Sequence, residues 1–517
     1  MEQSVGTEFS TTIGIGYKDE GSLMNTLVSS RRLLVLVYML VIFTAASQPI
    51  TDPDFWWHLK TGQFILKTWT IPHTDIFSTV RFGSEWVTHE WLSEAFMYLV
   101  YSRLGYGGLI VIFSLIVTAA FAIIYQLCRK RAGHPYVSGF SLILGAAATM
   151  PTWGVRPQMF SIFFASIFIS FLDKYSRNEN TRCVWWLPAL MILWVNMHAG
   201  FALGLALIVL TIAGILLDDL LLHKNSLGAI WRRLFPLFAV LTVSIAVVSL
   251  NPNCARMYSY PFETLTSHSM MRYIQEWKSP DFHEPMFQAL SFMILATFSA
   301  LALSNKRARP GELLILVVTG WATLRSSRNV PFFVIVAMPL LTEHLWDWIS
   351  SQHWCRWLVF PEKLEIGRKA SIKVILNVGL LVAVPIGVVA FKVEHSLAKQ
   401  VATEAIGFPA GAADFILDHK PPQPIFNEYG WGGYLIWKLY PNYQVFMDGR
   451  ADVYGDALVE EYVKVHDGES LWRASLSSHG IRTVLVKPDV PLASLLREDT
   501  GWEKVFEDQQ AVIFVRR

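Results

Sequence analysis

The sequence has few cysteines and none of the short motifs that mark soluble cofactor-dependent enzymes. Its four cysteines stand singly, without the close spacing of a thiolate metal site or a redox pair: Cys128, Cys183, Cys254 and Cys355. There is no Walker loop, dinucleotide fingerprint or zinc-protease helix. The net charge of +2 is uninformative about nucleic acid, and no basic stripe with interleaved aromatic residues indicates such a partner.

Hydrophobic residues, in contrast, make up 53% of the 517 residues, and 20 residues are tryptophan. Apolar runs recur from Leu33 to Phe391, each long enough to cross a hydrocarbon core of roughly 30 Å. We therefore expect a polytopic α-helical membrane protein. Residues 1 to 32 are rich in Ser, Thr and Gly, which predicts a disordered cytoplasmic tail. Arg31 and Arg32 precede the first apolar run, as in an uncleaved signal anchor.

The distribution of Lys and Arg predicts about eleven spans with a cytoplasmic N-terminus, because basic loops tend to stay on that side. The spans lie near residues 33 to 48, 106 to 128, 135 to 150, 158 to 173, 183 to 198, 200 to 222, 234 to 250, 286 to 304, 311 to 324, 329 to 347 and 372 to 391. The loops assigned to the cytoplasm are 129 to 131, 174 to 182, 223 to 233, 305 to 309 and 352 to 373. This pattern requires residues 89 to 104 to be an amphipathic helix on the outer interface. A transmembrane domain of residues 33 to 391, with a first outer loop at 50 to 105, follows.

Residues 392 to 517 have an ordinary soluble composition in which short strands alternate with amphipathic helices. Strands are predicted at Pro424 to Phe426, Tyr443 to Met447, Thr483 to Val486, Lys504 to Glu507 and Ala511 to Val515. Helices are predicted at Ala410 to Asp418, Gly432 to Leu439, Ala457 to Val465, Leu471 to Ser478 and Pro491 to Arg497. We expect a C-terminal α/β domain anchored outside the cytoplasm.

The unusual polar motifs of the membrane domain all fall on the predicted outer side. They are TDPD at 51 to 54, GVRPQ at 154 to 158, NMHAG at 196 to 200, the loop at 251 to 285, and RSSRN at 325 to 329. Charges at membrane depth are costly and usually lie in a functional cavity. We therefore predict that these motifs share an active site around the acidic first loop.

Asp52 and Asp54 are the candidate catalytic carboxylates. Just beyond a span, either is placed to accept a proton from an attacking hydroxyl or to bind a divalent metal ion such as Mg²⁺ or Mn²⁺. His58 completes a candidate metal set of the Asp and His type, and His58 and Glu90 are also candidate substrate contacts. The alternative is a solvated Asp-Pro turn.

Arg156 is a candidate phosphate clamp, because a guanidinium binds phosphate oxygens bidentately and stays charged. Arg325 and Arg328 allow the same interpretation, and they break the positive-inside pattern. For all three the alternative is an interfacial arginine that reaches lipid headgroups. His198, in a short outer turn, either binds substrate or caps a helix. Lys278 lies in an outer loop that either binds substrate or contacts the soluble domain.

Two polar segments of the soluble domain follow predicted strands, which is where ligands bind in open α/β sheets. The segments NEYGWGGY, at 427 to 434, and MDGRADVYG, at 447 to 455, supply the candidate acceptor contacts Glu428, Tyr429, Asp448 and Arg450. The alternative is loop chemistry in which glycine permits tight turns.

Together these features resemble the GT-C superfamily, the multispan glycosyltransferases that use sugars linked to lipid phosphates. The likeness rests on TDPDFWWHL in the first outer loop, the interfacial helix after it, the many spans and the C-terminal domain. Over most of residues 33 to 517, the motifs DPDFWWHLKTG, HEWLSE, RPQMF, RNVPFF and NEYGWGGYLIW also resemble bacterial members of that type. Many relatives show Asp-Glu where this chain has Asp-Pro-Asp, so the choice between the two carboxylates stays open.

The resemblance implies an inverting transfer of a hexose or pentose from a polyprenyl-phosphate carrier to an extracytoplasmic glycan, lipid or protein. Asp52 or Asp54 would be the base or a metal ligand, and the protein would lie in a bacterial inner membrane with its C-terminal domain in the periplasm. A second likeness is to oligosaccharyltransferase catalytic subunits, whose soluble domain carries WWDYG; here FNEYG keeps only the end of that motif. Transfer to protein is therefore one alternative function, and non-catalytic binding or assembly of lipid-linked glycans is another.

Overall fold

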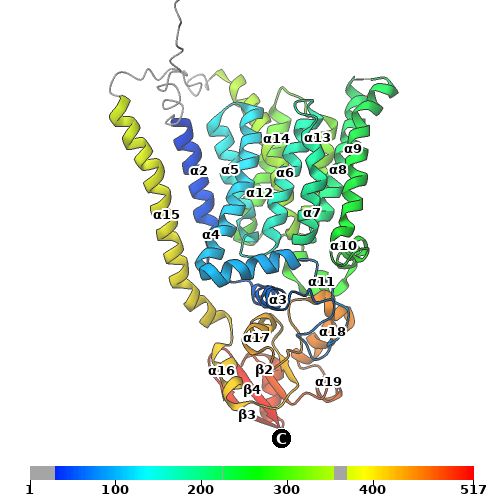
Figure 1. The fold of residues 1–517 in the computed structure, drawn as a ribbon, viewed down its shortest axis with the longest axis vertical. Helices are drawn as coiled ribbons and strands as arrows, with labels where there is room; N and C mark the ends of the chain where they lie inside the picture. The colour runs from blue at the N-terminus through cyan, green and yellow to red at the C-terminus, as the bar shows by residue number, and fades with distance from the viewer. Residues whose placement is uncertain (1–29, 224, 354–369) are drawn as a thin grey trace, which may run out of the picture.

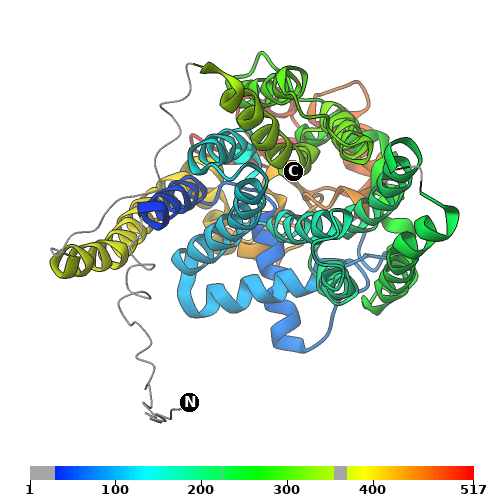
Figure 2. The ribbon, with the colours of Figure 1, turned by 90° about the horizontal axis from the view of Figure 1, so that it is seen from above.

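The computed structural model describes residues 30–223, 225–353 and 370–517. These residues form a bundle of long helices with a small domain of strands and short helices at one end (Figure 1). Residues 1–29 of the predicted tail and residues 354–369 of the predicted basic loop lie outside the described residues. Seen along the bundle, α2 (Ser30–Ala46) and α15 (Ala370–Gly407) stand side by side at one edge (Figure 2).

A helix lies at each of the predicted spans. Besides α2 and α15, the bundle contains the second part of α4 (Trp91–Ala132), α5 (Pro135–Thr149), α6 (Gln158–Ser176), α7 (Leu187–Met197), α8 (Phe201–Asp218), α9 (Leu227–Val247), α12 (Gln288–Leu303), α13 (Pro310–Arg325) and α14 (Val330–Ser351). Among the described residues, seven helices are long and apolar enough to cross a membrane, by length and composition. The prediction of a polytopic helical protein is confirmed, and the count of eleven spans stays a prediction.

Helix α4 changes direction at Gly105. The φ of this residue, 61°, lies in the left-handed region that glycine adopts without strain. The part before the break lies along the end of the bundle that faces the C-terminal domain, and the part after it runs into the bundle (Figure 1). The break thus separates the two segments that the sequence predicts as an interfacial helix and a span.

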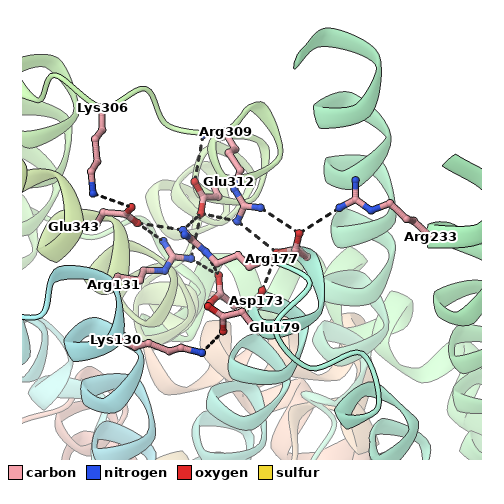
Figure 3. Close-up of polar contacts among 11 residues, drawn as sticks. Lys130, Arg131, Asp173, Arg177, Glu179, Arg233, Lys306, Arg309, Glu312 and Glu343 are labelled. Atoms are coloured by element: carbon pink, nitrogen blue, oxygen red, sulfur yellow. Dashed lines mark hydrogen bonds and ion pairs between the residues drawn. The ribbon is translucent and has the colours of Figure 1, made fainter. Parts of the chain in front are cut away.

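At the opposite end of the bundle a network of ion pairs joins α4, α6, α13 and α14 (Figure 3). Arg131 contacts Asp173 and lies 3.2 Å from Glu312 and 3.5 Å from Glu343. Arg177 pairs with the same three carboxylates at 3.2, 2.6 and 3.1 Å. The basic residues that predict a cytoplasmic end therefore also hold four helices together.

Replacing Arg131 with methionine is expected to lower the free energy of unfolding by about 3 kcal/mol, because the three largely buried carboxylates lose one of the two arginines that contact all of them. The matched control is Lys130→Met. Its pair with Glu179 is solvent-exposed, with 51% of the lysine side chain accessible, so a loss of only about 0–1 kcal/mol is expected. Unfolding of both variants in detergent micelles measures the difference, and equal losses would contradict a stabilising role for the network.

The C-terminal domain contains a four-stranded mixed sheet with helices around it. Its elements are α16 (Ala410–His419), β1 (Ile425–Asn427), α17 (Gly432–Leu439), α18 (Ala451–His466), α19 (Trp472–Ser478), β2 (Thr483–Val486), α20 (Pro491–Glu498), β3 (Trp502–Glu507) and β4 (Val512–Arg516). The strand order is β1-β2-β4-β3, with β1 and β2 parallel and the other pairs antiparallel. Four predicted strands and all five predicted helices of this domain are confirmed.

The fifth predicted strand, Tyr443 to Met447, is wrong. Val445 forms an isolated parallel bridge with Ser78 of the first outer loop, and its N–H donates to Phe77 O at 3.1 Å. The next N–H donates to the side chain of Asn427 at 2.7 Å. Because these groups satisfy the backbone, the segment needs no partner strand, and it ties the domain to the outer loop instead.

Helix α3 (Phe55–Thr68), which follows the TDPD motif, packs directly on the domain. Trp56 is fully buried, with its ring centroid 5.1 Å from that of Tyr434 in α17 and 5.6 Å from that of Phe408. A Cβ at Gly433 would lie 2.5 Å from Pro53 O, so only glycine permits this approach. The acidic motif is therefore held between the bundle and the domain.

Candidate active site

A cavity of about 990 Å³ lies where the C-terminal domain meets the bundle. Its wall comes from the turns before α3 and α6, the turn between α7 and α8, segments of the 251–285 loop, the start of α14, and the C-terminal domain. Nine of the thirteen predicted site residues line it: Asp52, Asp54, His58, Glu90, Arg156, His198, Arg328, Tyr429 and Arg450. Motifs that the sequence places on one side of the membrane thus share one cavity, and their roles stay predictions.

Arg156 lies between two carboxylates in the cavity wall. Its Nε is 3.0 Å from Asp52 Oδ2, and its Nη1 donates to Glu276 Oε1. The other oxygen of Asp52 accepts the N–H of Asp54 at 2.9 Å. Asp52 is therefore committed to two tasks: it holds the arginine, and it fixes the turn that leads into α3.

The pKa of Asp54 suits the role of a general base. Trp57 Nε1 donates to its Oδ1 at 3.1 Å. Loss of solvent in the cavity wall, and then repulsion from the neighbouring Asp52 carboxylate, raise the pKa of Asp54 to about 6. A base works best when its pKa lies near the operating pH, so Asp54 is better suited than an ordinary carboxyl group to remove a proton.

Three imidazoles surround the buried carboxylate of Glu90. His89 Nε2 is 3.0 Å from its Oε1, His198 Nε2 is 3.4 Å from the same oxygen, and His58 Nδ1 is 3.6 Å from its Oε2. Although burial opposes the charged form, these neighbours hold the pKa of Glu90 below its usual range. Glu90 therefore stays ionised and fixes three rings of the site.

His198 is a neutral ring with a defined tautomer. Its Nδ1 accepts the N–H of Gly200 at 2.9 Å and lies 2.7 Å from Ser161 Oγ. Trp194 Nε1 donates to that Oγ at 2.7 Å, so the serine hydrogen is free to point at the ring. The ring hydrogen is consequently on Nε2, which faces the acceptor Glu90 Oε1 at 3.4 Å. Burial lowers the pKa of His198 to about 3, so the ring is a hydrogen-bond donor without charge.

Two of the predicted phosphate and substrate contacts lie outside the cavity lining. The side chains of Lys278 and Arg325 are exposed, and the Arg325 guanidinium lies 5.6 Å from the ring centre of Trp321. Lys278 follows one segment that lines the cavity and Arg325 precedes another, but neither residue belongs to the lining. Their predicted roles in the site therefore have no support in the geometry.

Two predicted acceptor contacts in the C-terminal domain also lie outside the lining. Glu428 Oε2 is 3.1 Å from His466 Nε2. Asp448 accepts from Arg450 Nε at 2.8 Å, and the same arginine is 2.8 Å from Asp75. Asp75, Asp448 and Arg450 are all buried. The two carboxylates neutralise the arginine, and the three residues together join the domain to the first outer loop.

Two further lining residues, Gly449 and Tyr462, are not among the predicted site residues, although Gly449 lies within the predicted segment MDGRADVYG. Tyr462 Oη accepts the N–H of Tyr429 at 2.7 Å and so fixes the loop after β1. A Cβ built on Gly449 would lie 1.7 Å from Asp54 Oδ1. Contacts between segments so far apart in the chain leave no spacing pattern to read.

The residues at the cavity do not fit the predicted metal site. Among the described residues there is no group of three or more His, Cys, Asp and Glu side chains arranged to hold a metal ion. Asp52 is paired with Arg156 instead, and His58 Nδ1 faces Glu94 Oε1 at 3.2 Å. The positive charge that faces the cavity comes from arginine.

No protein-family model and no curated protein sequence matches the chain, but solved structures do. The archaeal oligosaccharyltransferase AglB from Archaeoglobus fulgidus, in complex with an inhibitory peptide and a dolichol-phosphate, matches with a TM-score of 0.51 and 10% identity, over 94% of this chain and 74% of that protein. The arabinofuranosyltransferase AftD from mycobacteria matches with a TM-score of 0.51 and 13% identity, over 95% of this chain and 40% of that protein. The chain has the GT-C fold. ArnT from Cupriavidus metallidurans bound to undecaprenyl phosphate is also similar, with a TM-score of 0.47 and 15% identity over 93% of this chain and 97% of that protein. The matches to AglB and AftD confirm, for the fold, the resemblance to GT-C proteins that TDPDFWWHL indicates.

Proposed function

We propose that the protein is a membrane glycosyltransferase that moves a sugar from a polyprenyl-phosphate carrier to an acceptor outside the cytoplasm. The observation that carries this proposal is one cavity of a GT-C fold in which Asp54, a carboxyl group of raised pKa, shares the wall with Arg156 and Arg328. The complex of AglB with a dolichol-phosphate supports the choice of a lipid phosphate.

In the proposed reaction Asp54 takes the proton of the acceptor hydroxyl while that oxygen attacks the anomeric carbon of the donor. The new bond forms as the bond from this carbon to the phosphate oxygen breaks, so the configuration inverts and the phosphate leaves with the electron pair. Arg156 and Arg328 stabilise the charge that develops on the phosphate. Asp52 acts through Arg156, as a positioning residue.

The proposed orientation places the C-terminal domain, residues 392 to 517, in the periplasm of a diderm bacterium. The described parts of the basic loops lie at the end of the bundle opposite this domain (Figure 1), as expected if those loops face the cytoplasm. The cavity then opens on the outer side, where a lipid carrier in the outer leaflet meets its acceptor.

The geometry favours a glycan or lipid acceptor over a protein acceptor. In the segment that resembles WWDYG, Phe426 and Asn427 are buried and Glu428 pairs with His466. Of this segment, only Tyr429 lines the cavity. The segment therefore lacks a free polar surface with which to read a peptide.

The test is a transfer assay with the purified protein in nanodiscs. Labelled polyprenyl-phosphate hexoses and pentoses serve as donors, and glycans and lipids of the cell envelope serve as acceptors. We expect a labelled acceptor with inverted anomeric configuration and a matching release of polyprenyl phosphate. Binding of donors without turnover across the whole panel would instead favour a glycan-assembly protein.

The rate of transfer is expected to fall by about tenfold for each pH unit below about 6, because a general base must be ionised to work. The sign follows from the raised pKa of Asp54, about 6: the active, deprotonated form is lost as the pH falls through that value. A pH profile of kcat/KM measures it. An acid limb near pH 4, the range of an ordinary aspartate, would contradict the assignment.

A further inference from the structure

Glu276 forms an ion pair with Arg156, whose guanidinium the proposed reaction requires for the donor phosphate. Its Oε1 accepts from Arg156 Nη1, while Asp52 lies at the Nε edge of the same guanidinium. Although burial opposes the charged form, Arg156 and Arg328 hold the pKa of Glu276 below its usual range. One arginine therefore serves two carboxylates, and a phosphate that arrived with both in place would meet them as like charges.

Of these two carboxylates, Glu276 is the one whose side chain is free to turn towards solvent. Its side chain is 35% exposed, against 14% for Asp52. Asp52 is further fixed because it accepts the N–H of Asp54, whereas the Glu276 carboxylate has its strong partner in Arg156. A rotation of the Glu276 side chain towards solvent frees Nη1 without disturbing the turn before α3.

The backbone around Glu276 stays anchored when its side chain turns. The Glu276 carbonyl oxygen accepts from Ser326 Oγ at 2.9 Å and from Ser327 Oγ at 3.1 Å. The ring of Trp277 lies under the guanidinium of Arg328, 5.3 Å from ring centre to Cζ. These contacts keep the segment in the cavity wall, beside both arginines.

We propose that Glu276 is an internal stand-in for the donor phosphate: it neutralises Arg156 in the empty site, and an incoming lipid phosphate displaces it. This inference rests on the proposed function, since it takes the lipid phosphate as the natural occupant of Arg156. Glu276 thereby sets the affinity for the carrier, and it restores the neutral pair when the spent phosphate leaves. The contact is a selective one, because an anion that binds Arg156 strongly replaces the carboxylate at a lower concentration than a weakly bound anion does.

The test compares the affinity of wild type, Glu276→Gln and Glu284→Gln for undecaprenyl phosphate in nanodiscs. Glutamine keeps the size of the side chain and one acceptor oxygen but removes the competing charge. If the empty site holds the Glu276 pair about ten times more often than the open form, Glu276→Gln binds about tenfold tighter. Glu284 is an exposed residue of the same loop, so its variant is expected to bind like wild type.

Equal or weaker binding by Glu276→Gln, with wild-type binding intact, overturns the inference and leaves the proposed function standing. Failure of all three proteins to bind the lipid phosphate overturns the proposed function, and the inference with it. Melting temperatures check that each variant is folded. Glu276→Ala is the second variant, and it too is expected to bind more tightly, because the effect depends on the lost charge and not on the amide.

Discussion

Asp54→Asn is expected to lower kcat for sugar transfer by about 10²- to 10⁴-fold, the range that a positioned general base contributes. Asparagine has nearly the shape of aspartate and still accepts the hydrogen bond from Trp57 Nε1, but it cannot take the proton of the acceptor. Transfer assays at saturating donor measure the loss. The melting temperature and the affinity for undecaprenyl phosphate are not expected to fall, because the substitution removes only a charge that burial already disfavours.

The matched variant is Asp52→Asn, which separates the two carboxylates of the motif. Asp52 holds Arg156 at 3.0 Å, so its loss is expected to weaken donor binding more than turnover. It also removes a charge that raises the pKa of Asp54, so the acid limb of the pH profile is expected to move below about 6. An inactive Asp52→Asn beside an active Asp54→Asn would reverse the roles.

The sequence predicts the helices of this protein well, because apolar runs and basic loops are local signals. It fails at Tyr443 to Met447, which has the aromatic and β-branched residues typical of a strand but whose pairing partner lies in the first outer loop, at Ser78. Which backbone groups pair depends on the arrangement of the whole fold, and the composition of one segment does not encode it.

For the site, the sequence predicts the side of the membrane and the residue types, but not the direction of each side chain. Arg328 lines the cavity and Arg325, three residues earlier, does not. Asp448 has the composition of a ligand contact, yet it is used to neutralise Arg450. The choice between Asp52 and Asp54 likewise depends on Arg156, which belongs to a different turn. Each of these outcomes is decided by packing between distant segments.

Gly449→Ala is expected to lower kcat by about 10²-fold, the cost of misplacing a reacting group by about 1 Å. The added methyl group would lie 1.7 Å from Asp54 Oδ1 and 2.7 Å from its Cγ, so the carboxylate has to move. The backbone itself accepts alanine, because Gly449 is not among the residues of positive φ. Gly430→Ala is the control: it lies in the same domain, also without a positive φ, and its Cβ would meet nothing within 4 Å.

A loss of activity in Gly449→Ala has two explanations, a displaced base and a disturbed domain, and the double variant with Asp54→Asn distinguishes them. If glycine acts only through the Asp54 carboxylate, its substitution has no further effect once that carboxylate cannot take a proton, and the double variant is as active as Asp54→Asn alone. If the domain itself is disturbed, the two losses multiply.

Gly432→Ala is the control for a disturbed domain. The Cβ of the new alanine would lie 2.2 Å from the backbone oxygen of Met447, so this variant is expected to have a lower melting temperature. A Gly449→Ala protein that melts like wild type, transfers poorly and loses nothing more in the double variant would therefore assign the C-terminal domain a direct part in placing the base.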